Sequence, residues 1–199
     1  MIERESLDEL LARILEEQPE LVEEVRGITR AGMEGLIPFH ESLARRLDLA
    51  RPRHSQVEAL GELAVRWITP GLEKLIRGLD AEPWLVSGGL LEALLPVAAE
   101  LGIPAERVLA TRVRWSPIGE MIGFECRGKS DLLRPHREAF ARPCVLVGDG
   151  MTDYEPFHDG LVDHFVAFTA NIRREAVVAT GAPVANSVAE LEQLLGRLL

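Results

Sequence analysis

The sequence predicts an α/β fold in which a parallel sheet is flanked by helices and carries a small helical cap. Two observations predict it. Residues 1 to about 80 place apolar side chains at helical spacing. From Trp84 onward, short apolar runs alternate with helical stretches, which is typical of strands covered on both faces of a parallel sheet. We therefore expect a mainly helical cap over residues 1–71 and an α/β core over residues 72–199.

In the first region, the spacing predicts helices in quick succession. The first begins at Leu7, from which apolar residues recur at i, i+3, i+4 and i+7. Gly32 to Pro38 separates the second helix from the third, and Thr69-Pro70-Gly71 marks a turn before the last. The remaining expected helices cover residues 20–30, 39–49, 55–67 and 72–79.

In the second region, the apolar runs predict strands over residues 84–86, 108–110, 112–115, 144–147 and 164–168. Helices are expected over residues 90–101, 130–140 and 187–198, and a hairpin or loop over 116–129. Ligands of such sheets bind beyond the carboxyl ends of the strands. The residues that follow strands 84–86 and 144–147 are therefore the first candidates for a site.

Composition excludes several classes of protein. Apolar residues make up 47% of the 199 residues and charged residues 27%, the balance of a globular protein with a core. A net charge of −10 excludes a general nucleic-acid binder, because phosphate-backbone affinity comes from Lys and Arg. No apolar run approaches the roughly 18 residues that suggest a membrane span. The acidic start is unlike a secretory signal, and two cysteines exclude a disulfide scaffold, so we expect a cytoplasmic protein.

The loop Gly148 to Asp153 is the first candidate site. Asp149 and Asp153 lie four residues apart after a buried-type strand. Carboxylate oxygens suit Mg²⁺, which takes one or two protein carboxylates plus water and phosphate oxygens. The alternative is a capped turn in which aspartate accepts backbone N–H bonds. The residues leave these two interpretations about equally favoured.

Ser87-Gly88-Gly89 is the second candidate, because a hydroxyl followed by glycines at the start of a helix can bind an anion. Taken alone, it is more simply a helix N-cap with permissive glycines. Lys129 is the third; it is one of only two lysines and precedes an expected helix. Its ammonium suits a phosphoryl group, although a solvated surface lysine is the simpler interpretation. The sequence contains no nucleotide-binding P-loop or dinucleotide motif, no hydrolase nucleophile elbow and no zinc-protease motif.

In this order, the three motifs resemble the second, third and fourth motifs of the phosphoserine phosphatase family in the haloacid dehalogenase superfamily. The resemblance implies that Ser87, with Gly88 and Gly89, binds the phosphoryl group. It implies that Lys129 neutralises the phosphate and the nucleophile. It also implies that Asp149 binds Mg²⁺ and that Asp153 supports the water shell of the metal.

The resemblance extends into the cap, where the family recognises the amino-acid part of its substrate. Glu5 matches a glutamate that meets the substrate ammonium and serves as acid/base, and Arg46 matches an arginine that pairs with the substrate carboxylate. The other matching substrate-binding positions are Met33, Gly35, Phe39 and Asn171.

One motif of the family has no counterpart. The family begins with a hydrophobic strand that ends in Asp-x-Asp-x-Thr and supplies the nucleophile, whereas no Asp-x-Asp occurs in this sequence. That strand lies at the centre of the family's sheet, so the central first strand is expected to be absent here. We expect the natural chain to start upstream of Met1; the alternative is a remnant that folds differently or takes a strand from a partner.

The resemblance thus implies a Mg²⁺-dependent phosphomonoester hydrolase of cytoplasmic serine biosynthesis that converts O-phosphoserine through an aspartyl-phosphate. The 199 residues are expected to lack turnover, because the nucleophile is not among them. The alternatives are a phosphotransferase or phosphatase for another small metabolite, and a non-catalytic phosphate-binding remnant. A plain helical structural module would bind neither Mg²⁺ nor phosphate. Phosphoserine is the expected partner, with neither nucleic acid nor membrane, and a homodimer is left open.

Overall fold

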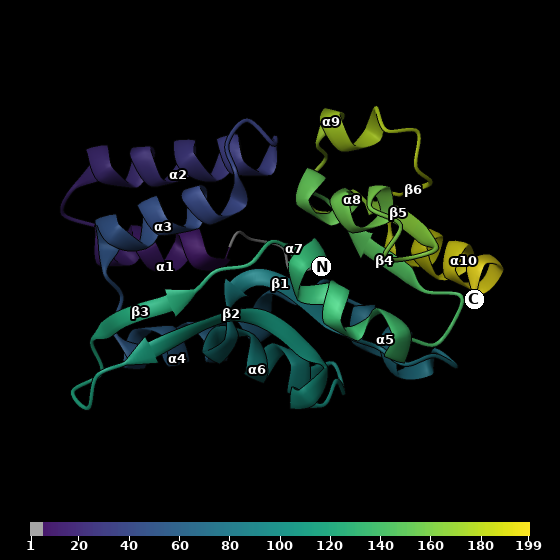
Figure 1. Ribbon diagram of the computed structural model, residues 1–199, viewed down its shortest axis with the longest axis horizontal. Helices are drawn as coiled ribbons and strands as arrows, with labels where there is room; N and C mark the ends of the chain where they lie inside the picture. Colours follow the sequence, from purple (N-terminus) through teal and green to yellow (C-terminus); the bar gives the residue numbers. More distant parts are fainter. Residues whose placement is uncertain (1–5) are drawn as a thin grey trace.

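The computed structural model describes residues 6–199 (Figure 1). Its helices are α1 (Ser6–Ile14), α2 (Pro19–Met33), α3 (Phe39–Ala50), α4 (His54–Ala64), α5 (Leu72–Gly78), α6 (Leu91–Glu100), α7 (Lys129–Leu133), α8 (Met151–His158), α9 (Glu175–Val178) and α10 (Val188–Leu198). Its strands are β1 (Leu85–Leu90), β2 (Val108–Trp115), β3 (Met121–Glu125), β4 (Val145–Gly148), β5 (His164–Phe168) and β6 (Val184–Ala185). Short 3₁₀ turns cover Val65–Trp67, Ala105–Arg107 and Arg134–Ala139.

Helices α1, α2 and α3 pack together and lie over one face of the β1–β2–β3 sheet (Figure 1). The apolar stripe of α1 explains its position, because Leu7, Leu10 and Leu11 are buried in the main core. Helices α2 and α3 meet closely at Gly32, where an added Cβ would lie 2.7 Å from Ser42 Oγ. A larger residue at position 32 would clash with the Ser42 side chain, so glycine allows α3 to pack this closely against α2.

Helix α4 packs against α6 of the core as well as against α1. The contact is close at Gly61, where a Cβ would lie 3.0 Å from the Pro96 ring. Figure 1 shows α4 and α6 together on the side of the sheet opposite α2 and α3. The domain boundary expected at residue 71 stays a prediction.

Within residues 6–199, the strands form two sheets of three. In the first, β1 pairs with β2 in parallel, with Leu85 opposite Val108, and β2 pairs with β3 antiparallel. In the second, β4, β5 and β6 are all parallel, with Gly148 opposite Ala167. Strands β1 and β4 are not hydrogen-bonded to each other, so the parallel sheet expected from the sequence is divided and carries one antiparallel edge strand. The position of a further central strand stays a prediction.

The antiparallel edge explains one difference from the sequence prediction. The runs 108–110 and 112–115 form one strand, β2, and the chain then reverses through Ser116 to Gly119 into β3. Gly119 adopts a left-handed conformation (φ 77°) that favours glycine, and its N–H donates to the Ser116 carbonyl at 2.9 Å.

Two further expectations were wrong in detail. Ser87, Gly88 and Gly89 belong to strand β1, and α6 begins only at Leu91, so Ser87 is not a helix N-cap. The helix expected over 130–140 ends at Leu133 and continues as a 3₁₀ turn, since Pro135 has no N–H to donate within a helix. The short elements α8, α9 and β6 were not predicted.

The main core joins the first five helices, β1, β2 and α6 to the second sheet through Val166 and Phe168 of β5. Both side chains are almost fully buried. This one cluster therefore packs the two sheets against the same core. Among the described residues, every helix is too short or too polar to cross a membrane.

Candidate active site

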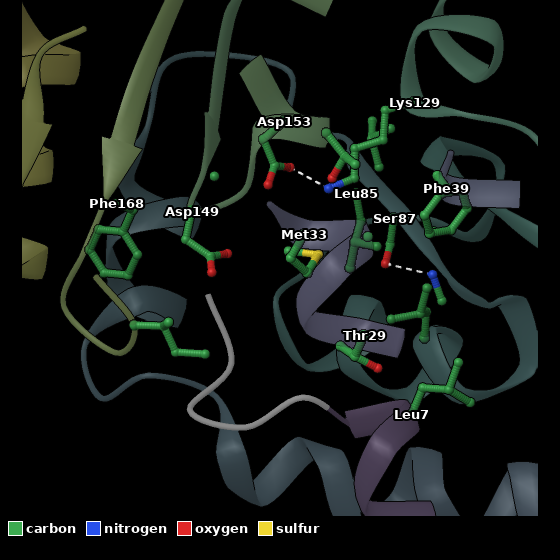
Figure 2. Close-up of a pocket in the computed structure, with 18 of the residues that line it drawn as sticks. Leu7, Thr29, Met33, Phe39, Leu85, Ser87, Lys129, Asp149, Asp153 and Phe168 are labelled. Carbon is green, nitrogen blue, oxygen red and sulfur yellow. Dashed lines mark hydrogen bonds and ion pairs between the residues drawn. The ribbon is translucent and has the colours of Figure 1, made fainter. Parts of the chain in front are cut away.

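A cavity of about 210 Å³ lies where the carboxyl ends of β1 and β4 meet the α1–α3 layer. Figure 2 shows Asp149 and Asp153 on one side, Ser87 and Phe39 on the other, and Met33 between them. Two apolar side chains, Leu7 and Phe168, also line the cavity. The cavity therefore has charged groups at the strand ends and apolar walls from the helices and the core.

Most of the residues singled out in the sequence line this cavity. They are Met33, Phe39, Arg46, Ser87, Gly88, Gly89, Lys129, Asp149, Asp153 and Asn171. Gly35 is not a lining residue; it follows α2 with a left-handed φ of 77°, which suits the turn toward α3. Glu5 lies outside the described residues. The structure thus brings these positions together, and their individual roles stay predictions.

The Ser87–Gly89 segment forms one wall of the cavity. The Ser87 hydroxyl accepts a hydrogen bond from the Gly89 N–H at 3.0 Å, so it is turned back over its own strand. The Gly88 carbonyl accepts from Thr111 Oγ1 of β2 at 3.0 Å. These bonds fix the positions of a small hydroxyl and two glycines at the strand end.

Two glycines of the core receive side chains from the helical layer. A Cβ on Gly88 would lie 2.0 Å from the Phe39 ring, and one on Gly150 would lie 2.6 Å from Met33 Cε. Both distances are far below ordinary carbon contacts of about 3.5–4.0 Å. The α2–α3 region thus packs directly on the end of β1 and on the segment after β4, which bear the candidate site.

The loop after β4 is shaped by Asp153. One of its oxygens contacts Lys129 Nζ, and the other accepts the Gly150 N–H at 3.0 Å. Both charged side chains are largely buried, with 13% exposure for Lys129 and 8% for Asp153. Gly148 permits this packing, since a Cβ there would lie 2.1 Å from the Asp153 carboxyl carbon. Asp153 therefore orients Lys129, from the start of α7, at the edge of the cavity.

Asp149 directly follows β4 and contacts the guanidinium of Arg174, which precedes α9. Side-chain exposure is 26% for Asp149 and 15% for Arg174. Arg174 was not predicted as a site residue. The available signal was its position after β5, since the carboxyl ends of parallel strands meet at one edge of the sheet.

The oxygen donors at the cavity are of the type that Mg²⁺ binds. Asp149 supplies a hard carboxylate at the cavity, whereas both Asp153 oxygens already accept from Lys129 and Gly150. Within the described residues, no group of three or more His, Cys, Asp or Glu side chains could hold a metal. Mg²⁺ usually keeps several waters and takes one or two carboxylates plus substrate phosphate, so such a sparse protein set is compatible with it.

Arg46 of α3 lines the cavity on the side of the helical layer and is 7% exposed. It hydrogen-bonds to Asp8, Thr29 and the Ser42 backbone. Its positive charge also reaches Cys126, where it opposes the larger effect of burial, which raises the pKa of that thiol to about 11. Asp8 and Thr29 were not singled out in the sequence, because a polar residue on a mostly apolar helix face carries no signal of its partner.

Asn171 connects the cavity to the start of the core. Its side-chain amide donates to the Thr69 hydroxyl at 2.8 Å, across 102 positions of the chain. Thr69 is buried and precedes the turn into α5. This bond fixes the loop after β5 against the turn that follows the first four helices.

Residues 2–157 match the haloacid dehalogenase-like hydrolase family. The chain is 32% identical over 188 residues to the phosphoserine phosphatase of Homo sapiens, covering 89% of this chain and 80% of that protein. It is 34% identical over 162 residues to the chloroplastic phosphoserine phosphatase of Arabidopsis thaliana, covering 76% of this chain and 55% of that protein.

A solved structure is similar throughout its length. It is a phosphoserine phosphohydrolase-like protein from Francisella tularensis, with a TM-score of 0.93 and 32% identity over 97% of this chain and 94% of that one. The chain therefore belongs to the haloacid dehalogenase-like hydrolase family. Within that family, the curated relatives it matches are phosphoserine phosphatases. The α/β fold and the family resemblance predicted from the motifs are confirmed.

Proposed function

We propose that this protein hydrolyses the phosphomonoester of O-phosphoserine in a Mg²⁺-dependent reaction. One observation carries the proposal: Ser87, Lys129 and Asp149, from three distant segments, line one cavity that Arg46 also lines. A hydroxyl, a cation and a carboxylate therefore line the same cavity as a second cation, Arg46, which comes from the helical layer. A small molecule with a phosphate and a carboxylate matches that pattern of charges.

In this proposal, the phosphoryl group binds near the carboxyl end of β1 and the first residue of α7. Lys129 neutralises the equatorial phosphoryl oxygens, and the Ser87 hydroxyl donates to them. Local cations are needed because the protein carries a net charge of −10 and repels anions as a whole. Met33 and Phe39 close the helical side of the cavity over the substrate and exclude water.

Asp149 is the residue that we propose holds the metal, with Asp153 supporting it while orienting Lys129. A bound Mg²⁺ would polarise the phosphoryl oxygens and offset their charge. Arg174 now contacts the same Asp149 carboxylate. Metal binding therefore requires that contact to loosen or to be shared.

We propose that hydrolysis proceeds through an aspartyl-phosphate, as the family resemblance implies. An aspartate oxygen bonds to phosphorus as the seryl oxygen leaves and takes a proton from an acid/base group, and water then cleaves the acyl phosphate to give inorganic phosphate and the free carboxylate. None of the described aspartates stands in an Asp-x-Asp motif. We therefore propose that these 199 residues bind substrate without turnover.

Calorimetry on the 199-residue protein tests the binding part of the proposal. We expect L-phosphoserine to bind in the presence of Mg²⁺, more tightly than phosphoethanolamine or inorganic phosphate, and more weakly when EDTA removes the metal. Absence of binding by all three ligands would refute the proposal. Equal affinity for phosphoserine and phosphoethanolamine would instead indicate a phosphatase-type site for another small metabolite.

Phosphate release tests the catalytic part. We expect release from phosphoserine only when an upstream strand ending in Asp-x-Asp-x-Thr is joined to Met1. A Mg²⁺-dependent rate from the 199 residues equal to that of the extended protein would contradict the proposed lack of turnover. Binding without release by the extended protein would favour a non-catalytic phosphate-binding role.

The free thiols Cys126 and Cys144 are compatible with the cytoplasmic location that we propose.

A further inference from the structure

Three helices converge on the Arg46 guanidinium. Nη1 donates to Asp8 Oδ1 of α1 at 3.0 Å and to Thr29 Oγ1 of α2 at 2.9 Å. The Thr29 hydroxyl donates in turn to the same Asp8 oxygen at 2.7 Å. Within α3, Nε donates to the Ser42 carbonyl at 3.2 Å. Asp8, Thr29 and Arg46 thus form a closed triangle of hydrogen bonds, which we call the arginine triangle.

The arginine triangle is buried. Arg46 and Thr29 are each 7% exposed, and the Asp8 side chain is 12% exposed. A buried guanidinium is costly unless an opposite charge and hydrogen bonds compensate it. Asp8 supplies the charge, and Thr29 supplies a hydroxyl that both accepts from Arg46 and donates to Asp8. The guanidinium is therefore held in one orientation rather than sampling several.

Counting donors shows what remains for a ligand. A guanidinium carries five N–H donors, and this one uses two on Nη1 and one on Nε. Nη2 makes no hydrogen bond to any residue that the structure describes. Because Arg46 lines the cavity, Nη2 is the nitrogen through which it can bind a ligand.

We propose that Asp8 and Thr29 are positioning residues that orient Arg46 so that Nη2 faces the cavity, and that they thereby set its preference for phosphomonoesters bearing a carboxylate. This inference rests on the proposed function. Without the Thr29 hydroxyl, Arg46 retains its charge and loses a restraint on its orientation. The carboxylate contact then weakens, whereas the phosphate contacts at Ser87 and Lys129 do not change.

The test compares L-phosphoserine with phosphoethanolamine, which has the same phosphate and ammonium groups but no carboxylate. For each variant, calorimetry in Mg²⁺ gives the ratio of the phosphoethanolamine dissociation constant to the phosphoserine dissociation constant. A lower ratio means a weaker preference for phosphoserine. In Thr29→Val, we expect phosphoserine to bind about tenfold more weakly, the effect of losing one hydrogen bond to a charged group, and phosphoethanolamine to change less than about twofold. Thr29→Ser restores the hydroxyl and should return the ratio to within about threefold of the unsubstituted value.

Thr180→Val is the matched control. Thr180 also donates a side-chain hydrogen bond, to the Val177 carbonyl at 2.6 Å, but it is not a lining residue of the site cavity. We expect this variant to leave the ratio unchanged. A folded Thr29→Val protein with an unchanged ratio would overturn the inference, as would an equal weakening of both ligands.

A second variant covers the case in which Thr29→Val does not fold. Asp8→Asn keeps an oxygen acceptor and removes the counter-charge, and it should lower the ratio in the same direction; an unchanged ratio would overturn the inference. The unsubstituted protein separates this inference from the proposed function. If it binds both phosphoesters equally, the positioning inference fails and the phosphate site stands. If it binds neither of them, nor inorganic phosphate, the proposed function fails, and this inference with it.

Discussion

Replacing Gly88 with alanine should push the helical layer away from the site. The new Cβ would lie 2.0 and 2.4 Å from two carbons of the Phe39 ring. Carbon atoms normally approach to about 3.5–4.0 Å, so the ring must withdraw by about 1.5 Å. Phe39 is the first residue of α3 and is only partly buried, so it can move by changing rotamer or by shifting the start of the helix.

The expected cost is that of overpacking, about 1–3 kcal/mol. For a protein of this size, 1 kcal/mol lowers the melting temperature by about 2–4 °C. Phosphoserine affinity should fall by at least about tenfold, because Phe39 and Gly88 both line the cavity. Thermal unfolding and calorimetry measure the two effects on the same sample.

A double-mutant cycle decides whether the ring is the cause. In a Phe39→Ala background, the space beside residue 88 is open, and Gly88→Ala should cost less than about 0.5 kcal/mol. Gly27→Ala is the matched control, since nothing lies within 4 Å of a Cβ there and the exposed site is inside α2. It should stabilise the protein by about 0.5–1 kcal/mol. Equal costs of Gly88→Ala in both backgrounds would refute this explanation.

Further predictions concern the charges and thiols. Lys129→Met should weaken inorganic phosphate and phosphoserine by similar factors of at least about tenfold in calorimetry, because the lost cation is at the phosphate end; a loss confined to phosphoserine would contradict this. Asp149→Asn should abolish the effect of Mg²⁺ on phosphate affinity, whereas a persisting effect would assign the metal to other residues. The Cys126 thiol, with a pKa of about 11, should react with iodoacetamide about a hundredfold more slowly at pH 8 than an unfolded cysteine. The raised pKa of Cys126 adds stability below about pH 9 that is lost toward pH 11, so the denaturation midpoint should fall over this range. A midpoint that instead rises because of Cys126 would count against the raised pKa.

Much of the secondary structure was predictable because it depends on neighbours in the chain. The apolar spacing from Leu7 predicted α1, and the run 164–168 predicted β5 with the observed bounds. Short elements such as α8 escaped, since its Pro156 and mixed polarity leave no clear periodicity. The separation of β1 from β4 lies where the family resemblance puts the missing first strand, and the position of that strand stays a prediction.

For the candidate site too, some features were predictable from the sequence and others were not. Local patterns marked Ser87, Lys129 and Asp149 as candidates, and the family resemblance supplied their expected roles. The partners of the charged site residues were not predictable from the sequence. Arg46 contacts Asp8 across 38 positions, and Asp149 contacts Arg174 from another loop. Hydrogen bonds and ion pairs act over a few ångströms whatever the separation in sequence. Which charges neutralise one another, and which nitrogen of Arg46 is left for a ligand, were therefore decided only when the helices and strands packed.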